Sequence, residues 1–255
     1  VKDHFTRVYQ IVLDQPLDHK NPEAGTFKHY LYLSHVDVAK PTVIITEGYN
    51  AVPRTYELSK IFKVNQVQVE YPFYRKSRPD SIQWKYLKND HAIEDYHKIV
   101  TKLKRIYTGK WISTGISKGG ETVLIYKSKY PWDVEVAVPY VAPLIKGQED
   151  PRTEMHIKKV GSDACREKIT KFQREVLIKR DSVLIEISKY AEEKGMSFTE
   201  LSTDEALEYA VLEFPFSFWQ WGGKCNEIPS ENATASQLFN YINKLVGISF
   251  YNDKT

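Results

Sequence analysis

The sequence has little cysteine, no long apolar run and almost no excess of charge of either sign. Two cysteines among 255 residues are too few for a zinc site built from cysteines or for a disulfide-rich miniprotein. No apolar stretch approaches the roughly 18 residues that a transmembrane helix requires, so we expect no membrane span. The formal net charge of +3 does not indicate a nucleic-acid-binding protein. These absences leave a globular protein with a hydrophobic core.

Short β-branched segments alternate with amphipathic segments in the first part of the chain. Apolar and polar residues alternate over 5–13 and 26–36, with turn residues between them, which predicts two antiparallel strands. Apolar steps of three and four residues predict a helix over 90–107. A second helix is expected from Ser117 to just before Pro131. With the buried strands predicted at 42–46, 66–71, 111–114 and 134–141, this is the pattern of an α/β protein.

The pattern becomes helical beyond about residue 150. Apolar residues from Ile169 to Ala191 predict one long helix. Ser202 and Glu205 have the spacing of a capping box, which predicts the start of another helix that continues to Phe214. We therefore expect residues 149–255 to form a helical insertion.

The most informative motif is G-x-S-x-G at residues 115–119, between a predicted strand and a predicted helix. In a nucleophile elbow the serine, here Ser117, sits on a sharp turn that exposes its hydroxyl. Gly115 and Gly119 are then required because side chains there would collide with neighbouring backbone. The alternative is a glycine-rich turn without chemistry. The elbow predicts an α/β-hydrolase fold with a mostly parallel sheet that is incomplete at its C-terminal strands. Residues 1–148 would form its N-terminal part and 149–255 a helical cap (lid).

An oxyanion hole in such a fold uses the amide after the nucleophile, which is that of Lys118. A second amide comes from the loop after the third strand. That loop contains Gly48 and Tyr49, and either could supply the N–H. An ordinary strand-ending turn is the alternative interpretation.

The general base is not evident, because in this fold the order along the chain is serine, acid, histidine. The only histidine after Ser117 is His156, which is too early for a residue that follows the last strand. We interpret His156 as a surface histidine. The catalytic Asp and His are expected beyond residue 255, on a longer enzyme of which this chain is the N-terminal part.

Several blocks resemble the secreted prolyl tri- and tetrapeptidyl aminopeptidases, the PS-10 type of serine peptidase family thirty-seven. The blocks cover residues 15–19, 46–49, 111–120, 140–143 and 218–222, so the resemblance extends over essentially the whole chain. It implies a Ser/Asp/His triad, of which Ser117 alone can be placed, with no metal and no cofactor. It also implies release of short peptides from free N-termini with a preference around proline. The expected location is secreted or periplasmic, with the leader not present in the chain.

Binding of a substrate's free ammonium group favours carboxylates near the serine. Glu47 and Glu70, each at a strand end, are candidates, although structural hydrogen bonds to loop amides or to Arg75 are an alternative that is favoured at least as much. Phe218, Trp219 and Trp221 could line an apolar pocket for proline, or they could belong to the core of the cap.

Cys165 and Cys225 could form a disulfide bond if the compartment is oxidising. The expected partners are peptide substrates, and the oligomeric state is open. Two other functions are considered beside a serine aminopeptidase. One is an esterase or lipase on the same scaffold, and the other is a catalytically incomplete binding module.

Overall fold

The computed structural model describes residues 3–147 and 150–253. Its contacts divide the chain into two compact units, Val1–Ile145 and Lys146–Thr255. The boundary that the sequence predicted, between 148 and 149, lies outside the described residues. No helix among the described residues combines the length and apolar character needed to cross a membrane.

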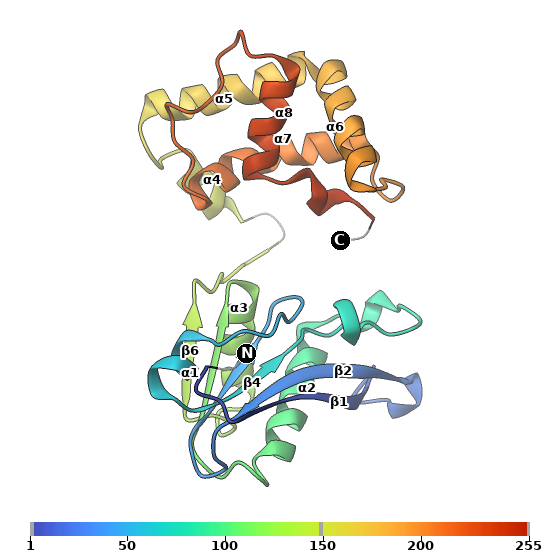
Figure 1. Ribbon diagram of the computed structural model, residues 1–255, viewed down its shortest axis with the longest axis vertical. Coiled ribbons are helices and arrows are strands. Elements are labelled where there is room, and N and C mark those ends of the chain that lie inside the picture. Colours follow the sequence, from blue (N-terminus) through green and yellow to red (C-terminus); the bar gives the residue numbers. More distant parts are fainter. Residues whose placement is uncertain (1–2, 148–149, 254–255) are drawn as a thin grey trace. The chain divides into compact units, whose positions relative to one another are not determined.

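The first unit is built on a six-stranded sheet with the order β1-β2-β4-β3-β5-β6 (Figure 1). β2 pairs antiparallel with β1 on one side and with β4 on the other, and the remaining neighbours are parallel. The strands are β1 (Arg7–Pro16), β2 (Thr26–His35), β3 (Thr42–Thr46), β4 (Asn65–Val69), β5 (Trp111–Ile116) and β6 (Val136–Tyr140). The predicted hairpin and the predicted mostly parallel sheet are confirmed.

Helices cover both faces of this sheet because the central strands are apolar on both faces. In β3, Ile44 contributes to the core shared with α2 (Asn89–Leu103) and α3 (Lys118–Lys129). Val43 and Ile45 point the other way, into a smaller cluster that includes Leu58 of α1 (Glu57–Phe62). This alternation follows from the two-residue period of a strand. It explains why all five residues of β3 are buried.

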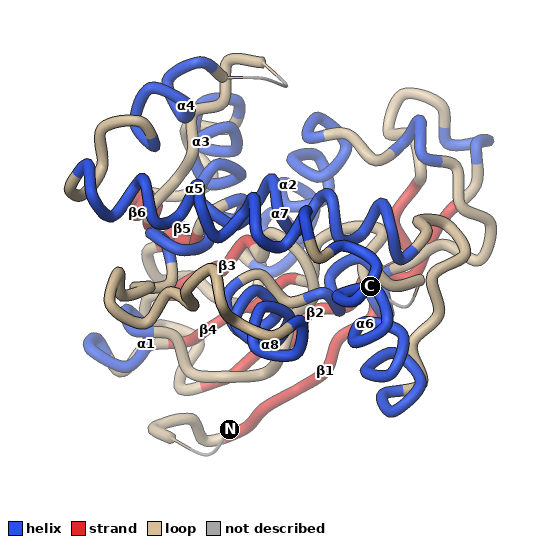
Figure 2. The backbone as a smooth tube through the Cα atoms, turned by 90° about the horizontal axis from the view of Figure 1, so that it is seen from above, coloured by secondary structure: helices blue, strands red, loops and turns tan. Residues whose placement is uncertain are grey.

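The second unit is helical and has its own core. Its helices are α4 (Pro151–Ile157), α5 (Asp163–Ile178), α6 (Arg180–Lys194), α7 (Thr203–Gln220) and α8 (Ala235–Leu245). The long segment 221–234 between α7 and α8 is irregular, as the tan tube in Figure 2 shows. Buried residues of α5 to α8 form one cluster, and Cys165 is joined to Cys225 by a disulfide bond with a Cα–Cα distance of 5.4 Å.

The single long helix predicted from Ile169 to Ala191 is wrong. The helix is interrupted at Lys179, whose φ of −95° and ψ of 23° lie outside the α-helical range. Apolar periodicity runs through the break because both helices bury residues in the same core. The capping box at Ser202 and Glu205 is confirmed. A second one, between Thr234 and Gln237, starts α8 and could have been found from the same spacing.

Candidate active site

Ser117 lies at the sharp turn between β5 and α3, and its side chain is exposed. Its φ of 55° and ψ of −122° are unusual for a residue with a side chain. Two hydrogen bonds hold the turn. The Ser117 N–H donates to the carbonyl of Tyr140 at 3.0 Å, and the Ser117 carbonyl accepts from the N–H of Glu121 at 2.9 Å. The strained turn therefore presents the hydroxyl at the carboxyl edge of the sheet.

The glycines beside Ser117 are required by close approach of backbone. A Cβ at Gly115 would lie 2.4 Å from the carbonyl oxygen of Gly119, and one at Gly119 would lie 2.3 Å from that of Thr46. Both distances are far below van der Waals contact. The collision with neighbouring strand and helix backbone that the motif predicted is confirmed.

The loop after β3 lies directly against the elbow. A Cβ at Gly48 would be 2.8 Å from the Cβ of Lys118 and 2.9 Å from the amide nitrogen of Gly119. Within residues 3–147 and 150–253, we find no acceptor for the N–H groups of Gly48, Tyr49 or Lys118. The Lys118 N–H is free because it belongs to the first turn of α3. The arrangement offers unpaired donors beside a serine hydroxyl, and their role as an oxyanion hole stays a prediction.

The side chain of Lys118 packs on tyrosines. Its Nζ lies 3.0 Å from the centre of the Tyr71 ring and 5.8 Å from that of Tyr49. The Nζ is buried and has no hydrogen-bond acceptor in the described part of the chain. Burial lowers the pKa of Lys118 to about 8, against the opposing charge of Glu121. The sequence did not reveal this contact, because 47 positions separate Tyr71 from Lys118 and no motif connects them.

Both carboxylates proposed from the sequence already have partners in this unit. Glu70 is 1% exposed, and it accepts hydrogen bonds from the N–H groups of Ala51 at 3.3 Å and Ser77 at 2.9 Å. Glu70 therefore forms the structural hydrogen bonds to loop amides that the sequence offered as the alternative to binding a substrate ammonium group. Glu47 is half-buried, and its Oε1 accepts from Gln68 at 2.6 Å and from the hydroxyl of Tyr56. Its Oε2 has no hydrogen-bond partner among the described residues.

The three aromatic residues proposed as a substrate pocket have three different environments. Phe218 is fully buried in the core of the second unit, so it lines no pocket, and the structure corrects that prediction. Trp219 is half-buried against Gly161 and lines a surface hollow of about 350 Å³ with α5 residues. Trp221 is 67% exposed. The spacing of these aromatic residues could not separate the three cases, because α7 carries apolar residues on its exposed as well as its buried positions and Trp221 follows its last residue.

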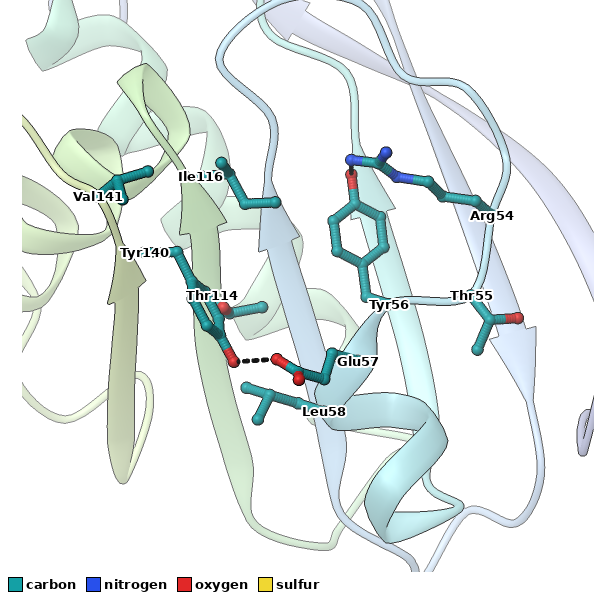
Figure 3. Close-up of a pocket in the computed structure, with 9 residues that line it drawn as sticks. All are labelled: Arg54, Thr55, Tyr56, Glu57, Leu58, Thr114, Ile116, Tyr140 and Val141. Atoms are coloured by element: carbon teal, nitrogen blue, oxygen red, sulfur yellow. Dashed lines mark hydrogen bonds between the residues drawn. The ribbon is translucent and has the colours of Figure 1, made fainter. Parts of the chain in front are cut away.

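A separate hollow of about 430 Å³ opens beside β5 and β6 (Figure 3). Most of its lining is apolar or aromatic, and across it the Tyr140 hydroxyl donates to Glu57 Oε2 at 2.7 Å. The lining residues are Arg54, Thr55, Tyr56, Glu57, Leu58, Thr114, Ile116, Tyr140 and Val141. Ile116 immediately precedes Ser117, so the hollow lies close to the elbow.

In the part of the chain that the structure describes, no histidine is hydrogen-bonded to Ser117. Among the described residues of the first unit, two histidines are hydrogen-bonded to aspartates, and neither histidine contacts Ser117. His19 Nε2 lies 2.7 Å from Asp95 Oδ1, and His97 Nδ1 lies 2.7 Å from Asp133 Oδ2. His156 is exposed on α4, in the second unit. The same described residues contain no cluster of three or more His, Cys, Asp or Glu that could hold a metal ion.

The strand order, the parallel core of the sheet and the serine on a strained turn between β5 and α3 define an α/β-hydrolase fold. The chain belongs to the family described as PS-10 peptidase S37, whose sequence profile matches residues 3–255. It is 37% identical over 246 residues to the prolyl tri/tetrapeptidyl aminopeptidase of Streptomyces mobaraensis. That match covers 94% of this chain and 52% of the relative, so the chain spans about half the length of this relative.

Solved structures similar to this chain include prolyl peptidases and esterases at low identity. A prolyl endopeptidase matches with a TM-score of 0.39 and 13% identity, over 53% of this chain and 21% of its own. Prolyl oligopeptidase B from Galerina marginata matches with a TM-score of 0.40 and 11% identity, over 53% and 20%. Brefeldin A esterase, a bacterial protein, matches with a TM-score of 0.40 and 12% identity, over 63% of this chain and 46% of its own.

Proposed function

We propose that the whole protein is a serine exopeptidase that releases tri- and tetrapeptides from free N-termini, with a preference related to proline. The observation that carries the proposal is the exposed Ser117 on its strained turn, beside the unpaired N–H groups of Lys118 and the Gly48–Tyr49 loop. Membership of a peptidase family supports the reaction class. The name of the Streptomyces mobaraensis relative supports the finer preference.

The proposed chemistry is acyl transfer through an acyl-enzyme. Ser117 Oγ attacks the scissile carbonyl while a histidine takes its proton, and the N–H groups of Lys118 and Tyr49 or Gly48 donate to the oxyanion. The C–N bond then breaks, and the leaving amine receives the proton. Water hydrolyses the ester and frees Ser117. We propose that the histidine and its acid partner lie outside the region shared with the relative, because the match covers only 52% of that relative.

Glu47 is the better of the two candidate carboxylates for a substrate ammonium group. Glu70 is enclosed and satisfied by loop amides, whereas Glu47 is half-buried with Oε2 unpaired among the described residues. A change of Glu47 to Gln should raise KM for a peptide with a free N-terminus. It should leave the rate of Ser117 acylation by a small ester within about twofold. An equal effect on both substrates would contradict the assignment.

Export of the protein to an oxidising compartment is also part of the proposal. The Cys165–Cys225 disulfide bond supports it, since such bonds persist outside the reducing cytosol. Thiol labelling of the denatured, unreduced protein from its natural source should find neither cysteine reactive. Labelling of both cysteines would contradict export.

The test of the catalytic function uses the full-length protein from its natural source and a fluorophosphonate. We expect an intact-mass increase of one adduct, mapped to Ser117. The adduct should be absent from Ser117→Ala and retained in Ser128→Ala, which changes an exposed serine of α3. Cleavage of a proline-containing peptide should then require a free amino terminus. Faster turnover of small esters without that requirement would indicate an esterase, and the absence of any adduct would indicate a binding module.

A further inference from the structure

The side chain of Lys118 links the two segments that carry the unpaired N–H groups. Lys118 follows the nucleophile, and its ammonium lies over the Tyr71 ring, with the Tyr49 ring also within 6 Å. The Tyr49 loop is tied to the same place, because the Tyr49 carbonyl accepts a hydrogen bond of 2.9 Å from the N–H of Tyr71. Tyr74 completes the group, with its ring edge-on to both Tyr49 and Tyr71.

This position is an unusual place for an ammonium group. A buried cation is normally paired or hydrogen-bonded, and the Lys118 Nζ has no acceptor in the described part of the chain. The interaction that remains is electrostatic attraction to the face of an aromatic ring. The Tyr71 ring is itself fixed, because its hydroxyl donates to Asn89 Oδ1 at 3.0 Å. The ammonium therefore contacts a rigid platform.

We propose that Lys118 is a positioning residue for acyl transfer, whose ammonium holds the Gly48–Tyr49 loop against the elbow by its contact with Tyr71 and Tyr49. The inference rests on the proposed serine chemistry. An oxyanion donor acts only at about 2.7–3.1 Å from the developing charge. A lysine that holds the Gly48–Tyr49 loop against the turn at Ser117 would keep both N–H groups within this distance of the future oxyanion before the substrate binds.

The charge on Lys118 makes this arrangement sensitive to pH. The groups that face it are Glu121 on its own helix and the tyrosines of the β3 and β4 loops. Burial raises the pKa of Tyr71 and of Tyr74, so both are neutral near pH 8. Lys118, whose pKa burial lowers to about 8, is the group that loses charge in this range. Acylation should slow as the pH rises through that value.

The experiment measures the rate of Ser117 phosphonylation in the full-length protein as a function of pH. Lys118→Met keeps the apolar stem and removes the charge, whereas Lys118→Arg keeps a cation. Lys129→Met is the matched control, because it removes a charge at the far end of the same helix, where Lys129 pairs with Glu94 at 3.0 Å. We expect Lys118→Met to lower kinact at least about tenfold with KI within twofold, and to lose the alkaline decline. Lys118→Arg should recover part of the rate, and Lys129→Met should behave as the wild type.

The outcomes separate this inference from the proposed function. If the wild-type protein is not acylated at Ser117, the proposed function fails and the inference fails with it. If the wild type reacts and Lys118→Met reacts equally, with the same pH profile, the function stands and the positioning role is overturned. If Lys118→Met does not fold, the pH dependence of the wild-type phosphonylation rate tests the positioning role by itself. A rate that does not fall between about pH 7 and 9.5 overturns the role.

Discussion

The hydroxyl of Thr46, at the end of β3, donates a hydrogen bond of 2.8 Å to the carbonyl of Gly119, in the first turn of α3. Thr46 is completely buried. The bond ties the strand that leads into the Gly48–Tyr49 loop to the turn that carries Ser117. The two segments of the candidate site are therefore joined beneath it by a polar contact that no solvent reaches.

Replacement of Thr46 by Val should weaken this junction. Valine has the same shape but cannot donate, so the unfolding free energy should fall by about 1–2 kcal/mol. The phosphonylation rate of Ser117 should fall as well, because the loop is no longer tied to the elbow. Urea unfolding and the rate measurement check both effects. Thr46→Ser keeps the hydroxyl and should retain most of the rate, and equal losses in the two variants would contradict the role of the hydrogen bond.

A change of Gly119 to Ala should lower the free energy of unfolding much more than the same change at a glycine whose Cβ position has no close neighbours. The new Cβ at Gly119 would lie 2.3 Å from backbone oxygen, so we expect a loss of more than about 3 kcal/mol and no acylation of Ser117. Gly195, which ends α6 with a φ of 60° and has no atom within 4 Å of its Cβ position, is the matched control. There we expect about 1 kcal/mol from the backbone conformation alone. Comparable losses at the two positions would contradict the steric argument.

Reduction of the Cys165–Cys225 bond should destabilise the helical second unit. The bond closes a loop of about 60 residues, which corresponds to about 4 kcal/mol of chain entropy in the unfolded state. Hydrogen exchange with and without reductant should show faster exchange in α5, α7 and α8 than in the sheet of the first unit. Uniform acceleration in both units would show that they unfold together.

The buried pair of His19 and Asp95 predicts a pH-dependent loss of stability when the histidine is removed. Burial raises the pKa of Asp95, and the hydrogen bond from His19 opposes that effect. In His19→Ala the carboxylate keeps its burial and loses this partner, so the unfolding free energy should fall by about 3 kcal/mol at pH 7.

The sign of the pH effect follows from proton binding. A carboxyl whose pKa is raised on folding binds protons more tightly in the folded state. The free energy of unfolding therefore falls as the pH rises from the pKa of the unfolded state to that of the folded state. The penalty of His19→Ala should therefore shrink when the pH is lowered from 7 toward 5. The control Asp95→Asn has no carboxylate to protonate at this position, so its stability loss should not show this dependence on pH. Denaturant unfolding at several pH values checks it, and a penalty that does not change with pH would contradict it.

Local patterns in the sequence predicted much of the fold, because strand and helix periods and the G-x-S-x-G motif can be recognised from residues that are neighbours in the sequence. Ser117 and its two glycines were found from six consecutive residues, and the steric reason was correct. The break at Lys179 was missed, because α5 and α6 bury residues in the same core and the apolar period continues across it. For Phe218 the sequence left a pocket and a core open, because apolar character does not distinguish them, and the structure places it in the core.

The sequence by itself determined the α/β pattern, the sharp G-x-S-x-G turn between a strand and a helix, and the family to which the chain belongs. The tertiary structure alone decided the partners of the polar side chains. It enclosed Glu70 among loop amides, joined His19 to Asp95 and placed the Lys118 ammonium on Tyr71. The physical reason is that a hydrogen bond or a cation–aromatic contact depends on distances of a few ångströms between residues far apart in the chain. Only the packing of the strands, helices and loops sets those distances.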